Sequence, residues 1–105
     1  MKRGLVALLV LCAGSAVAQT ADPDPELGRK LYTSYCTRCH GINLVSTSGA
    51  YFDLRTFPRD DKERFLKSMN EGKRAMPAWK GIVKPEEIEA IWAYIGKVNN
   101  WGPAK

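Results

Sequence analysis

Apolar residues recur with helical spacing in the first part of the chain. Leu27, Leu31 and Tyr35 stand at i, i+4 and i+8, so a helix would carry them on one face. Residues 24–26 read Asp-Pro-Glu, which is typical of a helix start: a capping side chain, a proline in the first turn and an acidic residue near the positive end. The pattern predicts a first helix that runs into the segment at residues 36–40.

Two further helices are predicted nearer the C-terminus. One covers residues 60–70, where Asp60 and Glu63 have capping-box spacing and Gly72 marks the end. The other begins at residue 85, and its apolar positions follow the spacing i, i+3, i+4, i+7: Ile88, Ile91, Trp92 and Ile95. The segments between these helices are expected to be irregular. Together the patterns predict a single all-α domain.

The N-terminal 18 residues have the pattern of a secretory signal peptide. Two basic residues precede an apolar run at residues 5–11, and residues 16–18 form an A-x-A cleavage site. The apolar run is shorter than the roughly 20 residues of a membrane-spanning helix. We therefore expect residues 1–18 to be cleaved, which removes Cys12 and leaves residues 19–105 as the mature domain.

The segment from Cys36 to His40 carries the chemistry of the chain. It matches C-x-x-C-H, the attachment pattern of c-type haem. Residues three apart on a helical turn lie on one side, so Cys36 and Cys39 can each add a thiol to one haem vinyl group. His40 follows directly and is placed to bind the iron. The motif predicts covalent haem c, with Cys36 and Cys39 as attachment residues and His40 as an axial ligand.

The same two cysteines suit two other kinds of site. A redox dithiol would be expected in a thioredoxin-like strand–helix context, which the chain lacks. A zinc site needs two more ligands. The chain has one histidine in total, and its only other cysteine is Cys12, inside the predicted signal peptide. Covalent haem is therefore the favoured interpretation.

Charge and length exclude some functions. The sequence has 16 Lys and Arg against 11 Asp and Glu, a net charge of +5, and two of the basic residues lie in the predicted signal peptide. No long basic tract of the nucleic-acid-binding kind is present. A mature chain this short buries little apolar surface and usually needs a cross-link or a bound group to stabilise its fold. A covalent haem would serve that purpose.

The spacing of these residues resembles that of a class I cytochrome c over nearly all of the mature chain. That family has a Gly, an aromatic residue and the first haem Cys at intervals of four, matched here by Gly28, Tyr32 and Cys36. Its last helix crosses the first at the Gly with an aliphatic and an aromatic residue three apart, matched by Ile91 and Tyr94. The resemblance implies a small cytochrome c fold: three to four helices wrapped around one covalent haem.

The resemblance also implies a distal ligand. In the family this is a Met in the loop before the last helix, commonly followed by Pro, and Met76-Pro77 matches. Met69 is a rival, but it stands at helical spacing from Phe65, where core packing is the simpler interpretation. A lysine or an open site remain further alternatives. The expected cofactor is thus one haem c with His40 and Met76 as iron ligands.

The middle of the chain departs from the broad family. Residues 41–57 contain no Pro, so the backbone carbonyl expected to orient His40 stays unassigned. The run Tyr51-Phe52-Asp53-Leu54-Arg55 is similar to that of small cytochromes that accept electrons from quinoprotein alcohol dehydrogenases. Arg55 is a candidate partner for a haem propionate, with a solvated surface position as the alternative. Tyr51, Phe52 and Trp79 are expected in the haem pocket.

The favoured function is that of a periplasmic single-electron carrier and not an enzyme. A periplasmic quinoprotein dehydrogenase is the expected donor, with an oxidase or another cytochrome as acceptor. No nucleic acid and no stable membrane insertion of the mature chain are expected. The alternative function is a haem enzyme or ligand sensor with an open distal site, although the chain has no second His to act as a distal base. A thylakoid lumen and attachment to an outer leaflet remain alternative locations.

Overall fold

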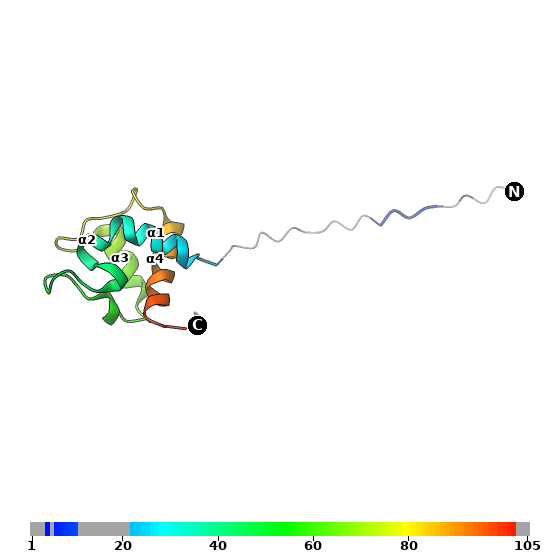
Figure 1. The fold of residues 1–105 in the computed structure, drawn as a ribbon. Coiled ribbons are helices and arrows are strands. Elements are labelled where there is room, and N and C mark those ends of the chain that lie inside the picture. Colours follow the sequence, from blue (N-terminus) through cyan, green and yellow to red (C-terminus); the bar gives the residue numbers. More distant parts are fainter. Residues whose placement is uncertain (1–3, 5, 11–21, 103–105) are drawn as a thin grey trace.

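The structure is a computed structural model, and it describes residues 4, 6–10 and 22–102. The predicted cleavage site at residues 16–18 and Cys12 lie outside these residues, as does most of the predicted signal peptide. The described part is helical (Figure 1) and contains no β-strand, which confirms the predicted all-α class. Its elements are α1 (Pro25–Tyr35), α2 (Thr37–His40), the 3₁₀ turns Ile42–Leu44 and Leu54–Thr56, α3 (Lys62–Glu71) and α4 (Pro85–Val98). Within the described residues, no helix is both long and apolar enough to cross a membrane.

The starts of α1 and α4 follow from local hydrogen bonds. The Asp24 carboxylate accepts the backbone N–H of Glu26 at 2.9 Å, which confirms the predicted cap. At α4, Lys84 has no acceptor with which to cap the helix. Instead, the Glu87 carboxylate accepts the Lys84 N–H at 3.0 Å, which is half of a capping box.

The start of α3 corrects the sequence-based prediction. Its N-cap is Asp61, whose side chain accepts the backbone N–H of Arg64 at 3.3 Å, whereas Asp60 was the predicted cap. The helix begins at Lys62, one residue later than expected. The Arg64 N–H lies in the first turn and has no acceptor within the helix, and Asp61, three residues earlier, is the residue placed to accept it. The helix ends at Gly72 as predicted, with φ of +76°.

The first and last helices cross at Gly28. A Cβ added to Gly28 would lie 1.9 Å from the Ala90 carbonyl oxygen and 2.9 Å from the Tyr94 Cβ, so only glycine permits this approach. Beside the crossing, the rings of Tyr32 and Tyr94 lie with centroids 5.2 Å apart. Ile91 is buried in the same core. The crossing implied by the family resemblance is therefore confirmed, and Figure 1 shows α1 and α4 side by side.

The most buried residues of α1 lie beside the apolar stripe that the sequence shows. Gly28 and Tyr32 are buried, while Leu27 and Tyr35 are each 40% exposed. Leu27, Leu31 and Tyr35 do share one face of α1, as predicted, but the close approach at Gly28 turns a neighbouring face of the helix toward α4. Tyr35 instead packs its ring against Trp79, with centroids 5.2 Å apart.

An aromatic cluster joins α3 to α4. The ring centroids of Phe65 and Trp92 are 5.0 Å apart, and those of Trp92 and Trp101 are 4.6 Å apart. Phe57 meets both Phe65 and Trp92 edge to face. Aromatic pairs in such geometry contribute about 0.5–1.5 kcal/mol each beyond their buried area. The cluster holds α3 in place, and α3 forms one wall of the cavity described next.

Candidate haem site

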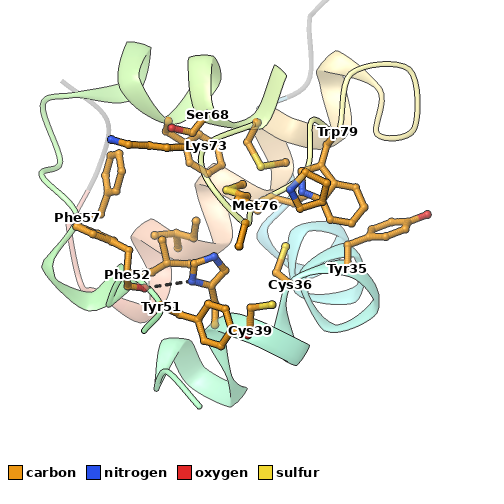
Figure 2. Close-up of a pocket in the computed structure, with 18 of the residues that line it drawn as sticks. Tyr35, Cys36, Cys39, Tyr51, Phe52, Phe57, Ser68, Lys73, Met76 and Trp79 are labelled. Carbon is orange, nitrogen blue, oxygen red and sulfur yellow. Dashed lines mark hydrogen bonds between the residues drawn. The ribbon is translucent and has the colours of Figure 1, made fainter. Parts of the chain in front are cut away.

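The predicted site residues meet at one cavity. It has a volume of about 290 Å³, and Cys36, Cys39, His40 and Met76 all contribute to its lining. Figure 2 shows the two cysteines and Met76 around the same space. Apolar and aromatic side chains make up much of the rest of the wall, among them Leu54, Phe57, Phe65, Met69, Trp79, Ile91 and Ile95. Residues about 40 positions apart in sequence are therefore brought to one pocket.

The imidazole of His40 is oriented by a backbone carbonyl. Its Nδ1 lies 3.1 Å from the carbonyl oxygen of Phe52, the interaction dashed in Figure 2. A carbonyl can only accept, so Nδ1 carries the proton and the Nε2 lone pair is left to bind a metal. Burial lowers the pKa of His40, which favours the neutral form that a ligand requires. Phe52 thus supplies the carbonyl that the sequence left unassigned.

The two cysteines lie on adjacent turns at the α1–α2 junction. Both are free thiols and partly buried. Burial, and to a lesser extent Cys39, raises the pKa of Cys36 to about 12, so this thiol is protonated at neutral pH. A reactive dithiol is activated by a lowered thiol pKa instead. In addition, no group of three or more His, Cys, Asp and Glu side chains suited to a metal ion occurs among the described residues.

Met76 is presented by a tight turn. The backbone N–H of Lys73 donates to the Met76 carbonyl at 3.0 Å, and the Met76 N–H donates back to the Lys73 carbonyl at 3.0 Å. Arg74, inside the turn, has a left-handed φ of +55°. The loop is anchored to α3 because the Trp79 N–H donates to the Met69 carbonyl at 2.7 Å. The turn therefore holds the Met76 side chain against the cavity.

Met69 lines the same cavity from α3. It is 2% exposed and belongs to the buried core, which agrees with the core role predicted for it. Trp79 also lines the cavity, as expected. Tyr51 and Phe52 line it too, but they are 37% and 45% exposed, so they form its outer wall.

Two arginines differ from what the sequence suggested. Arg55, the candidate propionate partner, is paired with Asp53 through Nε–Oδ1 and Nη2–Oδ2 contacts of 3.0 and 2.9 Å, and it is not part of the cavity lining. Arg64 does line the cavity and was missed. The signal for it was helical spacing, because Arg64 and Ser68 stand at i and i+4 on α3, beside Phe65 and Met69, and all four line the cavity.

The residues present fit a covalently attached haem. The apolar wall suits a macrocycle, the two thiols suit its vinyl groups, and an oriented imidazole nitrogen and a thioether suit the iron. The donor atoms among these residues are an imidazole nitrogen and sulfur, both of which bind haem iron in cytochromes c.

Comparison with known proteins decides the family. The family described as cytochrome C oxidase, cbb3-type, subunit III, matches residues 23–95. Cytochrome c6 of Nostoc sp. is 38% identical over 76 residues, covering 69% of this chain and 68% of that protein. The chain belongs to the cytochrome c family. It is accordingly an electron-transfer protein with covalent haem c and not an enzyme.

Other relatives of this cytochrome fall into two groups. Cytochrome c6 of Bryopsis maxima is 32% identical, covering 75% of this chain and 97% of that protein. Quinohemoprotein alcohol dehydrogenase ADH-IIG of Pseudomonas putida is 36% identical over 69% of this chain, but the match covers only 10% of that protein. No solved structure matches the chain.

Proposed function

We propose that this cytochrome is a periplasmic single-electron carrier with one haem c, attached through Cys36 and Cys39 and ligated by His40 and Met76. The observation that carries the proposal is the His40–Phe52 hydrogen bond at the edge of a cavity that the other three residues also line. One histidine, oriented with a free nitrogen, faces the same space as the two attachment thiols and a thioether.

Each residue has a separate task in this proposal. When bound, the haem supplies an iron that accepts and releases one electron. His40 binds through Nε2, and the Phe52 carbonyl fixes the plane of its ring. The Lys73–Met76 turn holds the thioether in place, and His/Met ligation raises the reduction potential. The apolar wall excludes water, which limits the reorganisation that accompanies a change of charge.

Haem extraction tests the attachment. Exported protein should retain its haem in acid–acetone, because thioether bonds survive conditions that release a ligated haem. The Cys36→Ala, Cys39→Ala double variant should lose it under the same conditions. A wild-type protein whose haem is extracted would contradict the proposal at its centre.

A second measurement separates the carrier from a haem enzyme or sensor with an open distal site. The ferric carrier should show a methionine–iron charge-transfer band, and the ferrous carrier should resist carbon monoxide because its sixth position is filled. Rapid carbon monoxide binding by the wild-type protein would favour the open-site alternative.

The donor we propose is a periplasmic quinoprotein alcohol dehydrogenase, with an oxidase or another cytochrome as acceptor. Support comes from the alcohol dehydrogenases of Pseudomonas putida that contain a segment similar to this chain. In those enzymes the cytochrome-like segment is part of the dehydrogenase chain. A separate cytochrome could accept electrons from a dehydrogenase that lacks such a segment. Stopped-flow mixing with a reduced dehydrogenase should show haem reduction, and its absence would exclude this donor.

We also propose that residues 1–18 are a cleaved signal peptide and residues 19–105 the mature cytochrome. The basic start, short apolar run and A-x-A site support this division. Mass spectrometry of the periplasmic fraction should find the chain beginning at residue 19. A full-length chain retained in the cytoplasm would contradict it.

A further inference from the structure

We propose that Arg64 binds a haem propionate and helps set the reduction potential; the inference rests on the haem site proposed above. Arg64 projects from the first turns of α3 and lines the cavity. Its guanidinium carbon lies 5.2 Å from the ring centroid of Phe52 and 4.9 Å from that of Phe57. The charge therefore lies against both rings, which meet each other edge to face with centroids 5.9 Å apart.

The position of this cation points to an anionic partner. The described residues provide no carboxylate in an ion pair with Arg64, whereas Arg29, Arg55, Lys62 and Lys97 all have one. Contact with two aromatic rings strips part of the water from the guanidinium, which strengthens its attraction to an anion. A planar guanidinium also matches a carboxylate with two parallel hydrogen bonds.

The covalent structure of haem fixes the position of its carboxylates relative to its vinyl groups. Its two vinyl groups and its two propionates occupy opposite sides of the macrocycle. With the vinyl groups held at Cys36 and Cys39, the propionates are directed to the far end of the cavity. Figure 2 shows Phe57 at the end opposite Cys36, and Arg64 is the cation in contact with that ring. The group therefore lies where a propionate is needed.

Arg64 is also linked to the proximal ligand. The ring under its guanidinium belongs to Phe52, whose backbone carbonyl holds His40. A propionate bound to Arg64 would thus brace the same loop that orients the imidazole. The other cavity-lining cations, Lys73 and Arg74, are exposed and belong to the Met76 turn, so water screens them more strongly.

The test compares three variants of the haem-loaded full chain. Arg64→Gln removes the charge, Arg64→Lys keeps the charge without the fork, and Arg55→Gln removes an equal charge that Asp53 already pairs outside the cavity. The measurements are the midpoint potential, by optical redox titration, and the propionate-bending band in resonance Raman spectra. A nearby cation favours the ferrous state, so its loss should lower the potential.

We expect Arg64→Gln to lower the potential and shift the propionate band, and Arg64→Lys to restore most of the potential while the band stays shifted. Arg55→Gln should change neither. If Arg64→Gln yields too little holoprotein, the band of Arg64→Lys decides alone, since that variant keeps the charge that supports folding. An unchanged band in the Arg64 variants, or an equal shift in Arg55→Gln, overturns the inference.

The outcome is separable from that of the proposed function. A wild-type protein that loses its haem in acid–acetone would overturn the function and the inference together. A covalent haem with an intact methionine–iron band, but with no response to Arg64, would overturn the inference alone.

Discussion

Two methionine thioethers, those of Met69 and Met76, line the cavity. One is carried by a helix and the other by a loop, and this difference separates their expected roles. Met69 belongs to the last turn of α3, is 2% exposed and packs with Phe65 in the core. Met76 sits in a loop, in a turn closed by two backbone hydrogen bonds. A loop can place a sulfur at a set distance from a metal without displacing a helix, which supports Met76 as the axial ligand we propose.

Replacing each methionine should therefore give different results. Met76→Ala should open the sixth position, lower the midpoint potential and allow carbon monoxide to bind the ferrous protein. Met69→Ala should leave the methionine–iron band in place but lower the free energy of unfolding by about 2–5 kcal/mol, because it creates a core cavity. Absorption at the charge-transfer band and denaturant unfolding measure the two effects. Loss of the band in Met69→Ala alone would reverse the assignment.

The turn that carries Met76 contains a strained residue. Arg74 has a φ of +55°, a conformation that costs a residue with a Cβ about 1–2 kcal/mol. Arg74→Gly should relieve the strain and stabilise methionine ligation by up to about 1 kcal/mol, since glycine also gains freedom in the unfolded chain. Ala75→Gly, in the same turn without a positive φ, is the matched control and should destabilise. Unfolding followed at the methionine–iron band measures both, and a less stable Arg74→Gly would refute the strain argument.

At the scale of single residues, the sequence predicts the chemistry of a side chain better than it predicts which groups will surround that side chain. The C-x-x-C-H motif and Met76-Pro77 led to four residues that line one cavity. The carbonyl behind His40 was not predictable, because every residue has one and only the folded loop selects Phe52. The pairing of Arg55 was not predictable for a similar reason. Its own turn supplies a carboxylate, Asp53, that the sequence pattern does not show to be close enough for two contacts.

At the scale of helices, the α1–α4 crossing leaves no space for an added side-chain atom at Gly28. A methyl group on Gly28 would overlap the Ala90 carbonyl at 1.9 Å, and backbone atoms cannot move aside as a flexible side chain can. Gly28→Ala should therefore force the helices apart and cost at least the 1–3 kcal/mol that is typical of an overpacked core. Gly49→Ala is the control, since an added Cβ there has nothing within 4 Å and the residue has no positive φ. Thermal unfolding of both variants decides, and equal stability would contradict the close crossing.

Helix existence was easier to predict than helix direction. The three amphipathic stretches all form helices, and Gly72 ends α3 as expected. The Leu27–Leu31–Tyr35 pattern does not show which face of α1 meets α4, because Gly28, which makes the closest contact, adds nothing to an apolar pattern. The shift of the α3 cap from Asp60 to Asp61 has a simpler cause. Two adjacent aspartates cap equally well, and the incoming chain decides between them.

For the whole molecule, charge around the cavity bears on partner encounter. Lys73 and Arg74 line the cavity, and Lys80 is exposed four residues after Met76. Cations around the opening would steer an acidic partner surface, and salt would weaken the steering. In the sequence, all three cations stand within four residues of Met76. The structure adds that Lys73 and Arg74 reach the cavity, while Lys80 is not part of its lining.

Charge reversal tests the steering. The Lys73→Glu, Lys80→Glu double variant should be reduced more slowly by the dehydrogenase than the wild type, and the wild-type rate should fall as ionic strength rises. Lys30→Glu, Lys67→Glu changes the net charge equally at exposed sites outside the cavity lining, so its rate should fall less. Stopped-flow reduction at several salt concentrations measures all three proteins. Reduction rates that depend neither on the salt concentration nor on the position of the reversed charges would exclude steering.

The crossing at Gly28 also governs how the chain can acquire its fold. Helix α1 finds its main partner in α4, at the other end of the domain, so the contact closes a loop from Gly28 to Ala90 before it stabilises either helix. Contacts so distant in sequence slow the conformational search, because the loop must close before the contact can stabilise the helices. A nascent chain that does not yet include residues 85–98 lacks the partner of α1 and cannot form this crossing. The domain therefore depends on residues from both of its ends, and a fragment that ends before α4 should not hold α1 in its native place.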